Sequence, residues 1–596
     1  GAMFSYDYKN NFNKRWRPVY TLYTYDNATD TYIPQKHGSA STLYERMTEE
    51  SVAQVQTSLN YERSFATDHH VKGMLLFEQI QYNNDLNSLE GQREFTITSV
   101  DQMYAGDQND KQSVNSPVIT PSATQSLAGR FNYDYKSKYL FEGSFSYMGS
   151  SRFGPGQRWG FFPGLQAGWR ISEEQFLKKN VPFLSNLKIR GSWGIVGDDG
   201  NAGFQWLDGY SYPGTSSYNG VNQPVRYISG NTVLAGLGFR PQPYEALTWF
   251  ESEIINLGLD ADLWDGKLHI EFDWFRRERT GLLAQRVLSL PQTVGAPLPQ
   301  ENLNSDMTRG LEVALGHRNR VGELQYSVSA NASIARTKNL HQERAPFGSS
   351  MSNWKDNRGY RWNDILFGYK VVGQFQNQEE IDNAPIHDGE GNRRLLPGDF
   401  RYEDFNNDGI IDENDMQPIG RTNSSGFVNT PNVSFGMNID LQWKGFDFNA
   451  LLQGATKLYV RYQEQLMAPL FFGRNGLSYF MDRWHRADPA DPKSPWIPGK
   501  YPSTRPHGQL ASNYRLSDFW VHDATYLRLR SVELGYTIPR SLLGNWGLNG
   551  LRVYANAYNV FTWSEVDYID PEHTPTNVGM QYPITRNFTF GVNVTF

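Results

Sequence analysis

Apolar and polar residues alternate along much of this chain, and the pattern is clearest in its last eleven residues. From Arg586 to Phe596, large apolar side chains take alternate positions, with small polar residues or glycine between them. A period of two predicts a β-strand with one apolar and one polar face. The strand runs to the final residue, and in a soluble sheet such an edge would invite aggregation. It fits either the last strand of a soluble β-sandwich or a strand in the wall of a membrane β-barrel.

The same alternation recurs in hairpins. Asp265-Gly266, between two alternating runs, is a strong hairpin signal. Lys136-Ser137-Lys138, Arg320-Val321-Gly322 and Lys444-Gly445 are further predicted turns. In all, the pattern predicts sixteen strands, at Ala2–Tyr8, Val52–Phe65, His70–Tyr82, Leu127–Tyr133, Tyr139–Tyr147, Trp159–Ile171, Leu187–Ile195, Ile255–Leu263, Leu268–Trp274, Leu311–Leu315, Leu324–Ile334, Val433–Trp443, Phe446–Leu452, Val532–Tyr536, Leu551–Ala557 and Arg586–Phe596.

The connections between these strands alternate in length, with short turns of about 2–6 residues followed by loops of about 20–90. The long connections include residues 83–125, 198–250, 338–430 and 461–522. Short turns on one side and long loops on the other are typical of an outer-membrane barrel, and a sandwich has no reason for this asymmetry. Strands of a barrel alternate in direction, and with the last strand ending in the periplasm the long loops lie outside the cell. The same count of crossings does not allow Phe367–Phe375 to cross the membrane as a single strand. The sequence therefore predicts an all-β, transmembrane antiparallel barrel.

Composition agrees with this prediction. The 596 residues are 20% charged and 14% aromatic, and no apolar run approaches the ~18 residues that a membrane helix needs. Any membrane crossing would therefore be made by strands. The formal net charge of −7 argues against a nucleic-acid partner, and the absence of cysteine excludes disulfides and thiolate sites. Because alternation starts at Ala2, we expect the chain to begin inside a strand and to be part of a longer protein.

From about residue 125 onward, short motifs follow one another in order. They are Gly149-Ser150-Ser151-Arg152-Phe153, Phe162-Pro163, Gly168-Trp169, Leu187–Gly194, Pro397-Gly398-Asp399, Tyr526–Arg530, Leu534-Gly535-Tyr536, Asn559–Trp563, Asp570-Pro571-Glu572 and Phe588–Phe596. Together they resemble the C-terminal part of the SusC/RagA-like TonB-dependent outer-membrane transporters. The resemblance implies a plugged barrel of about 22 strands. The sixteen predicted strands fall short of that number, and the family's N-terminal plug is not visible in residues 1–596.

The resemblance also implies a function and partners. Members of the family sit in the outer membrane of Gram-negative bacteria and import an oligosaccharide or oligopeptide. They couple to the TonB complex and work beneath a SusD-like surface lipoprotein that acts as a lid. The other expected partners are the plug and remaining strands of the same transporter, and membrane lipid. A passive porin and a surface glycan-binding adhesin remain alternatives, and an outer-membrane enzyme is a further class. We expect no enzyme, because no catalytic constellation stands out from the sequence.

The most specific candidate site is the acidic segment Asp404–Asp415, which lies inside the long external excursion 338–430. Its oxygen-bearing residues have the spacing of an EF-hand-type calcium loop, with Gly409 at the sharp turn and Asp rather than Glu at the last position. The predicted ligands are the side chains of Asp404, Asn406, Asp408, Asp412 and Asp415 and the carbonyl of Ile410. We expect a structural calcium ion here; the alternative is a solvated acidic turn.

Aromatic residues are the other candidates, because sugars stack on aromatic rings and membrane interfaces use the same residues. At strand ends, an interface girdle is the favoured interpretation of Trp274, Trp443 and Trp563. In loops, the candidates for contact with substrate or lid are Trp354, Tyr360, Trp362, Phe471, Phe472 and Trp496. The sequence does not choose among these, and the substrate-binding residues stay unknown. His69-His70 is interpreted as a solvated pair rather than a metal site.

Overall fold

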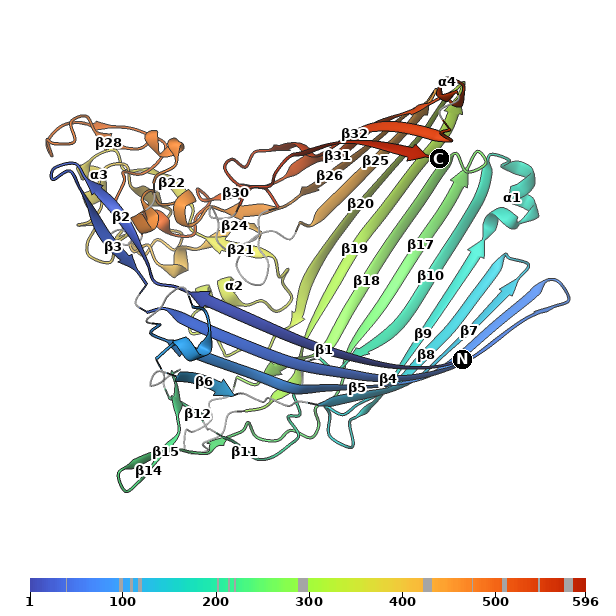
Figure 1. Cartoon of the computed structure of the whole chain (residues 1–596), viewed down its shortest axis with the longest axis horizontal. Helices are drawn as coiled ribbons and strands as arrows, with labels where there is room; N and C mark the ends of the chain where they lie inside the picture. The colour runs from blue at the N-terminus through green and yellow to red at the C-terminus, as the bar shows by residue number, and fades with distance from the viewer. Residues whose placement is uncertain are drawn as a thin grey trace.

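The computed structural model is dominated by one large antiparallel sheet that curves into an open trough (Figure 1). It describes the chain except residues 39, 96–99, 108–110, 116–120, 201–202, 213–214, 219–220, 288–297, 422–430, 474, 506–511, 545–546 and 573–581. Both termini, α1 and α4 lie at one end of the trough. The long connections, with β21, β22 and β28, lie at the other (Figure 1). The wall is thus an all-β structure with its short turns at the end opposite its long loops.

Sixteen long strands form the wall, and each pairs with the next of them along the chain. They are β1 (Ala2–Arg17), β4 (Thr42–Phe65), β5 (His69–Arg93), β7 (Ser122–Tyr135), β8 (Tyr139–Ser150), β9 (Trp159–Arg170), β10 (Leu184–Asp198), β17 (Phe250–Leu263), β18 (Leu268–Gln285), β19 (Gln300–Val321), β20 (Leu324–His341), β25 (Val433–Trp443), β26 (Phe446–Thr456), β31 (Tyr526–Ile538), β32 (Gly550–Ser564) and β33 (Asn587–Thr595). These are the strands that the alternation predicts.

Shorter elements fill the connections. Small two-stranded sheets pair β2 (Tyr20–Asp26) with β3 (Thr31–His37), β11 (Tyr210–Ser211) with β16 (Gly238–Phe239), β12 (Thr215–Tyr218) with β13 (Val221–Pro224), β14 (Arg226–Ser229) with β15 (Thr232–Ala235), β21 (Ile365–Gly368) with β24 (Gln417–Arg421), β22 (Val371–Gln374) with β23 (Phe400–Tyr402), β27 (Tyr459–Arg461) with β30 (Val521–Asp523), and β28 (His485–Arg486) with β29 (Trp496–Ile497). Strand β6 (Lys111–Asn115) pairs with the loop-side end of β5. Among the described residues, the α-helices are α1 (Gln175–Asn180), α2 (Ser350–Asp356), α3 (Gln378–Asp382) and α4 (Arg540–Leu543), and the remaining helical turns are short 3-10 turns.

None of the helices in the described ranges is long and apolar enough to span a membrane.

Several strands are longer than the alternation predicts. The predicted strand Ala2–Tyr8 continues to Arg17, paired with β4 along its whole length. Likewise β5 continues to Arg93, into the segment 83–125 that composition predicted to be loop. Polar residues on both faces suit a strand that projects beyond the membrane into water. The composition of such a projecting segment resembles that of a loop, although its backbone groups still form hydrogen bonds with the neighbouring strands.

Strands β1 and β33 form the two edges of the sheet. Each pairs with one long strand, β1 with β4 and β33 with β32, and within the described residues no pairing joins the two edges. The wall is therefore an open sheet of antiparallel strands, as expected of a part of a larger barrel.

The turns follow the sequence with one correction. Lys444 and Gly445 both have positive φ, 48° and 88°, which is the backbone that a tight I′-type hairpin turn needs. The β19–β20 turn lies at Gly322-Glu323, so Gly322 alone of the predicted turn residues belongs to it, because Arg320 and Val321 still pair with β20. The segment Phe367–Phe375 makes no crossing, since β21 and β22 belong to small sheets of the loop region.

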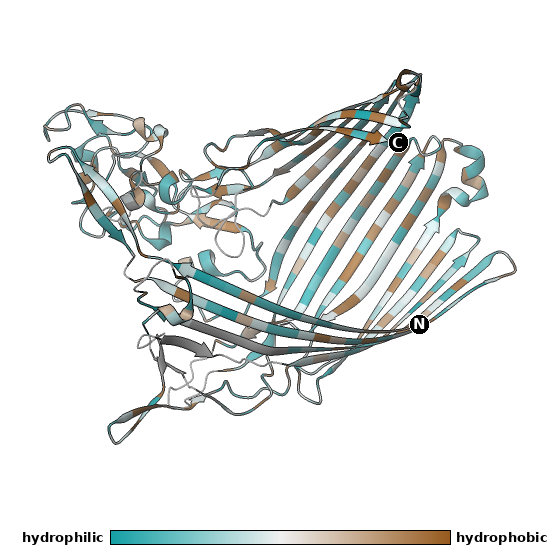
Figure 2. Cartoon of the chain, viewed as in Figure 1, coloured by the Kyte–Doolittle hydropathy of each residue, from teal (hydrophilic) through white to brown (hydrophobic). Residues whose placement is uncertain are grey.

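Alternating faces of the wall have different chemistry, and Figure 2 shows apolar and polar residues interleaved along each strand. On β25, Asn438 and Asp440 share hydrogen bonds with Asn449 of β26. Val433, Phe435, Ile439 and Leu441 take the opposite face of the same strand. Asn432 precedes β25, and its amide donates to the Ala335 carbonyl and to Asp364.

Among the described residues, the largest buried cluster lies mostly in the loop region and includes only the loop-side ends of the wall strands β26 and β31. It includes Phe400, Tyr402, Trp520 and Tyr526, each at most 4% exposed. A single curved sheet has no interior of its own, so the hydrophobic core forms where the long connections pack together. We call the packed part of segments 342–421 and 457–525 the loop domain.

Candidate functional site

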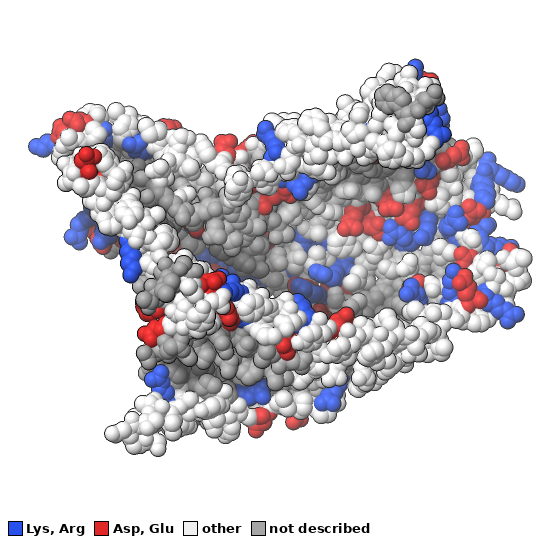
Figure 3. All heavy atoms as spheres, in the orientation of Figure 1, with Lys and Arg blue, Asp and Glu red and all other residues white. Residues whose placement is uncertain are grey.

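Two surfaces are candidates for function: the loop domain at one end of the trough, and the polar concave face. Figure 3 shows acidic and basic side chains gathered on the concave face. Arg190 binds Asp273 through both terminal nitrogens at 2.6 Å and also reaches Asp260 at 3.1 Å. Arg552 bridges Asp447 and Glu533 in the same way across three strands. The concave face therefore carries charges that are largely paired with one another.

A buried ion pair fixes the loop domain around the Pro397-Gly398-Asp399 motif. The Asp399 carboxylate is fully buried and accepts hydrogen bonds from Arg505 at 2.5 Å and from the Asn513 amide at 2.8 Å. Gly398 has φ of +92°, and a Cβ there would approach Trp484 to 2.3 Å. The motif needs glycine for this turn, and its aspartate joins segments more than 100 residues apart in sequence.

Arg515 joins the acidic loop to the rest of the loop domain. Its guanidinium lies 4.8 Å from the Tyr369 ring centre and donates to the carbonyls of His387 and Ile411. His387 is buried, and its Nε2 accepts the Tyr402 N–H, so its Nδ1 carries the proton and donates to Pro385. Burial lowers the pKa of His387, which keeps the imidazole neutral.

Two motifs that are distant in sequence meet where the wall joins the loops. Arg528 of β31 is 1% exposed and pairs with both Asp570 and Glu572, while the Tyr526 hydroxyl donates to Glu572 at 2.7 Å. Thr562 of β32 accepts a further hydrogen bond from Arg528. Both motifs stand out in the sequence, but nothing in the sequence links them. The link could have been found only from the rule that a buried arginine needs carboxylate partners.

The acidic loop 404–415 is ordered mainly by hydrogen bonds to its own backbone. Asp404 accepts from the N–H groups of Asp408 and Gly409, at 3.2 and 2.9 Å. Asp415 is fully buried, and its carboxylate accepts from the N–H groups of Phe405, Asn406 and Asp412. Asp412 caps the short turn at Glu413–Asp415. The structure thus brings the predicted ligand residues into one turn, with several of their oxygens bonded to the loop's backbone.

The chemistry of the donors in this loop suits calcium, which takes carboxylate, amide and carbonyl oxygens. Across the described ranges, however, no three His, Asp or Glu side chains converge closely enough to form a metal-binding group. Asp408 accepts from Ile410 N–H at 2.9 Å, and Asn406 donates to Asp408 at 2.8 Å. Holding an ion would therefore require these side chains to turn toward a common centre.

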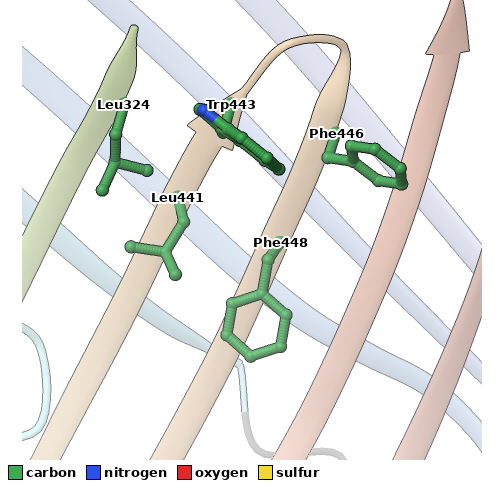
Figure 4. Close-up of a pocket in the computed structure, with 5 residues that line it drawn as sticks. All are labelled: Leu324, Leu441, Trp443, Phe446 and Phe448. Atoms are coloured by element: carbon green, nitrogen blue, oxygen red, sulfur yellow. The ribbon is translucent and has the colours of Figure 1, made fainter. Parts of the chain in front are cut away.

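Aromatic residues at the turn end of the wall lie on its convex face. Leu324, Leu441, Trp443, Phe446 and Phe448 line one apolar depression beside the β25–β26 turn (Figure 4). Trp443 and Trp563 lie at strand ends and are about half exposed, at 50% and 52%, which suits a membrane interface. Trp274 lies in the middle of β18, so its predicted position at a strand end is wrong. The alternation fades after Trp274, although the strand continues.

The loop aromatics lie in different surroundings. Trp354 stacks on Phe405 with ring centres 5.5 Å apart, and Trp362 lies under Arg336 at 4.4 Å. Trp496 packs against Arg486, Phe471 is buried, and Tyr360 is 78% exposed. The side chain of Phe472 lies outside the described residues.

The adjacent histidines His69 and His70 do not form a shared site. His69 contacts the Tyr133 hydroxyl and His70 the Ser64 hydroxyl, each at 2.8 Å.

The chain matches no known family profile. It is 28% identical over 493 residues to the TonB-dependent receptor SusC of Bacteroides thetaiotaomicron, covering 80% of this chain and 44% of SusC. It is 26% identical over 503 residues to TonB-dependent receptor P3 of Formosa agariphila, covering 81% of this chain and 46% of that receptor. The chain is thus similar to the SusC-like TonB-dependent receptors over about four fifths of its length. It spans about half the length of the relatives it matches.

A solved structure shows the same fold. The RagAB peptide transporter superposes with a TM-score of 0.71 over 100% of this chain and 60% of the matched chain, at 17% identity. The fold class, an antiparallel outer-membrane β-barrel wall, and the outer-membrane location in a Gram-negative bacterium therefore follow. The apolar convex face is the side that faces lipid, and the polar concave face lines the lumen.

Proposed function

We propose that this chain forms the wall and external loops of a TonB-dependent transporter that imports an oligomeric nutrient, an oligosaccharide or an oligopeptide. The relation to SusC over 80% of the chain is the observation that carries this proposal. A concave face lined by charged and amide side chains supports it, because such a lumen suits a polar solute. The role is transport rather than catalysis, since the relatives are receptors.

Energised uptake separates this proposal from a passive porin. Cells that carry the full-length gene are given labelled glycan and peptide oligomers, with and without a functional TonB complex. The proposal predicts uptake of one oligomer class that stops when TonB is inactivated. Uptake that continues without TonB would indicate a porin, and surface binding without uptake would indicate an adhesin.

A SusD-like surface lipoprotein is the proposed partner at the loop end. The loop domain packs around a buried cluster, so it offers an ordered surface on which a lid can sit. Specific complexes of this kind bury about 1,200–2,000 Å² or more. The test is affinity purification of the full-length protein from outer membranes. The proposal predicts recovery of a lipoprotein in near-equal amount, and recovery of the barrel without one would contradict it.

The acidic loop is the proposed calcium site, with a structural role. An ion bound by Asp404, Asn406, Asp408, Asp412, Asp415 and the Ile410 carbonyl would offset the repulsion among the carboxylates. The loop is already anchored beside the rest of the loop domain, because Ile386 exchanges backbone hydrogen bonds of 2.9 Å with Gly409 and Ile411. Extracellular sites of this type bind with dissociation constants on the order of 10⁻⁴–10⁻³ M.

Calcium titration of the full-length protein tests this site. We expect Asp404→Ala combined with Asp408→Ala to abolish the binding of one ion. The control is Asp491→Ala, since Asp491 sits in another acidic turn and its side chain accepts the Lys493 N–H. Equal binding by the double variant and the wild type would leave the loop as a solvated acidic turn.

A further inference from the structure

The convex face of β20 changes from apolar to basic toward its loop-side end. At alternate positions the strand carries Leu324, Tyr326, Val328, Ala330, Ala332 and Ile334, and the next two positions of the same face are Arg336 and Lys338. The apolar run covers ten residue steps, about 33 Å along the strand at about 3.3 Å per residue. At a tilt of about 40°, that is about 25 Å along the membrane normal, the height of a barrel's apolar band. Arg336 therefore lies at the outer boundary of the hydrocarbon layer.

Two neighbouring strands place arginines at the same level. Arg309 of β19 lies directly opposite Arg336, and Arg276 of β18 lies directly opposite Arg309. One row lower on the same face, the corresponding residues are Trp274, Leu311 and Ile334. On this face of three adjacent strands, the residues thus change from apolar to arginine at the same level. We call Arg276, Arg309 and Arg336 the arginine row.

The carboxylates near the row pair with its two ends. Arg336 binds Asp364 with a shortest distance of 2.8 Å, and Arg276 pairs with Glu278. The Trp362 ring packs against two arginines of the row. Its centre lies 4.4 Å from the Arg336 guanidinium and 5.2 Å from that of Arg309.

The middle arginine is the one without a carboxylate. Arg309 is exposed, and within the part of the chain that the structure describes no carboxylate lies at ion-pair distance from it. One row further out on the same face, Lys338 lies over the Tyr360 ring, and Glu253 accepts the indole N–H of Trp193.

Like charges directly opposite each other on neighbouring strands destabilise a sheet. An anion close to both charges offsets this repulsion. We infer that the arginine row binds the phosphate group of a lipid in the outer leaflet. A phosphate presents oxygens that guanidinium groups hold with charge-assisted hydrogen bonds, and arginine suits this geometry better than lysine. The acyl chains of the same lipid would lie on the apolar row formed by Trp274, Leu311 and Ile334. This position favours a lipid over a free anion, because headgroup and chains are matched at one boundary.

This site is separate from transport, since it lies on the outer wall and not in the lumen. The inferred lipid site requires only that the barrel sits in the membrane with its long loops outside, and it requires no transported substrate and no partner protein.

The test measures lipid binding by the full-length protein purified in an uncharged detergent. Phosphorylated lipid A, the same lipid without phosphate, and inorganic phosphate alone are titrated against the wild type and Arg309→Gln. Each basic residue near an anionic surface contributes about 1 kcal/mol, so we expect Arg309→Gln to weaken binding of the phosphorylated lipid about fivefold. The control is Lys444→Gln. Lys444 also lies over a tryptophan, with its Nζ 5.7 Å from the Trp443 ring centre, but at the opposite end of the wall.

The outcomes separate the alternatives. The inference predicts a fivefold loss for Arg309→Gln, no change for Lys444→Gln, and weak binding of the lipid without phosphate to every variant. Equal binding by Arg309→Gln and wild type would overturn it, as would an equal loss in both variants. Inorganic phosphate that binds as tightly as the lipid would assign the row to a free anion and also overturn the inference. Electrophoretic mobility with and without heating shows whether each variant is a folded barrel.

Discussion

Ion pairs at the level of single residues tie the wall to its loops. Arg528 is only 1% exposed, and its carboxylate partners Asp570 and Glu572 are 20% and 32% exposed. Breaking a buried pair leaves uncompensated charge, which costs more than the pair contributes by itself. Arg528 therefore holds the segment after β32 against β31.

Replacing this arginine should loosen the junction. We expect Arg528→Met to destabilise the barrel by about 2–3 kcal/mol, which is less than the ~3–5 kcal/mol of a fully buried pair because the carboxylates are partly exposed to water. The control is Arg530→Met, since Arg530 lies two residues along the same strand and its side chain bonds the Asn559 side chain. The measurement is the midpoint of heat-induced unfolding, followed by electrophoretic mobility. Equal midpoints for the two variants would contradict this role.

His522 gives the loop domain a dependence on pH. Burial lowers the pKa of His522 to about 4, and its ring lies 4.2 Å from that of Tyr462. A histidine in the unfolded chain has a pKa near 6.5. Between about pH 6.5 and 4, the unfolded state therefore binds a proton that the folded state does not bind. The stability that neutral His522 contributes is thus complete above pH 6.5 and is lost as the pH falls toward 4.

Hydrogen exchange measures this effect locally. We expect exchange in β27 and β30 to accelerate as the pH drops from 6.5 to 4, after correction for the intrinsic rate. His522→Phe keeps a ring against Tyr462 and should remove most of the acceleration. If the variant and the wild type accelerate alike, another group controls the acid response.

Residue-level prediction from the sequence worked where the signal is local. The spacing within Asp404–Asp415 is visible because all the oxygens lie in twelve consecutive residues. The contact of Arg528 with Asp570 is not visible, because 42 residues separate the two and only strand pairing brings them together. The arginine row has the same character, since it appears only when β18, β19 and β20 are aligned.

At the level of elements, the hydrophobic pattern predicts where strands lie better than where they end. All sixteen predicted strands are present, because period-two alternation is strong where one face meets lipid. The pattern fades where a strand leaves the membrane, as in β1 after Tyr8 and in β18 after Trp274. Backbone pairing continues there without the alternation.

The two faces of β25 give a direct test of the barrel. Ile439 lies near the middle of the strand on the apolar face, and we expect Ile439→Arg to destabilise by about 2–4 kcal/mol. Asn438 lies on the lumenal face, hydrogen-bonded to Asn449, and Asn438→Arg should cost far less. Refolding into lipid vesicles along a urea series measures both. Equal costs at the two positions would contradict the assignment of the faces.

At the scale of the whole molecule, the wall is incomplete as a barrel. Its two edges, β1 and β33, each carry one row of backbone groups that pairs with no described strand. Exposed edges of this length promote aggregation, and a membrane offers them no water. The chain also spans about half the length of its relatives. We therefore propose that further strands of the same transporter join β1 to β33.

Cysteine crosslinking in the full-length protein, in an outer membrane, tests that proposal most directly. The chain has no cysteine of its own, so introduced pairs report without background from residues 1–596. As a positive control, Tyr6→Cys with Ala53→Cys joins directly paired positions of β1 and β4 and should crosslink. Cysteines at 4, 6 or 8 of β1, each combined with one at 588, 590 or 592 of β33, should give no crosslink. Efficient crosslinking of any β1–β33 pair would show that these sixteen strands close on themselves, and would contradict the account of this chain as part of a larger transporter wall.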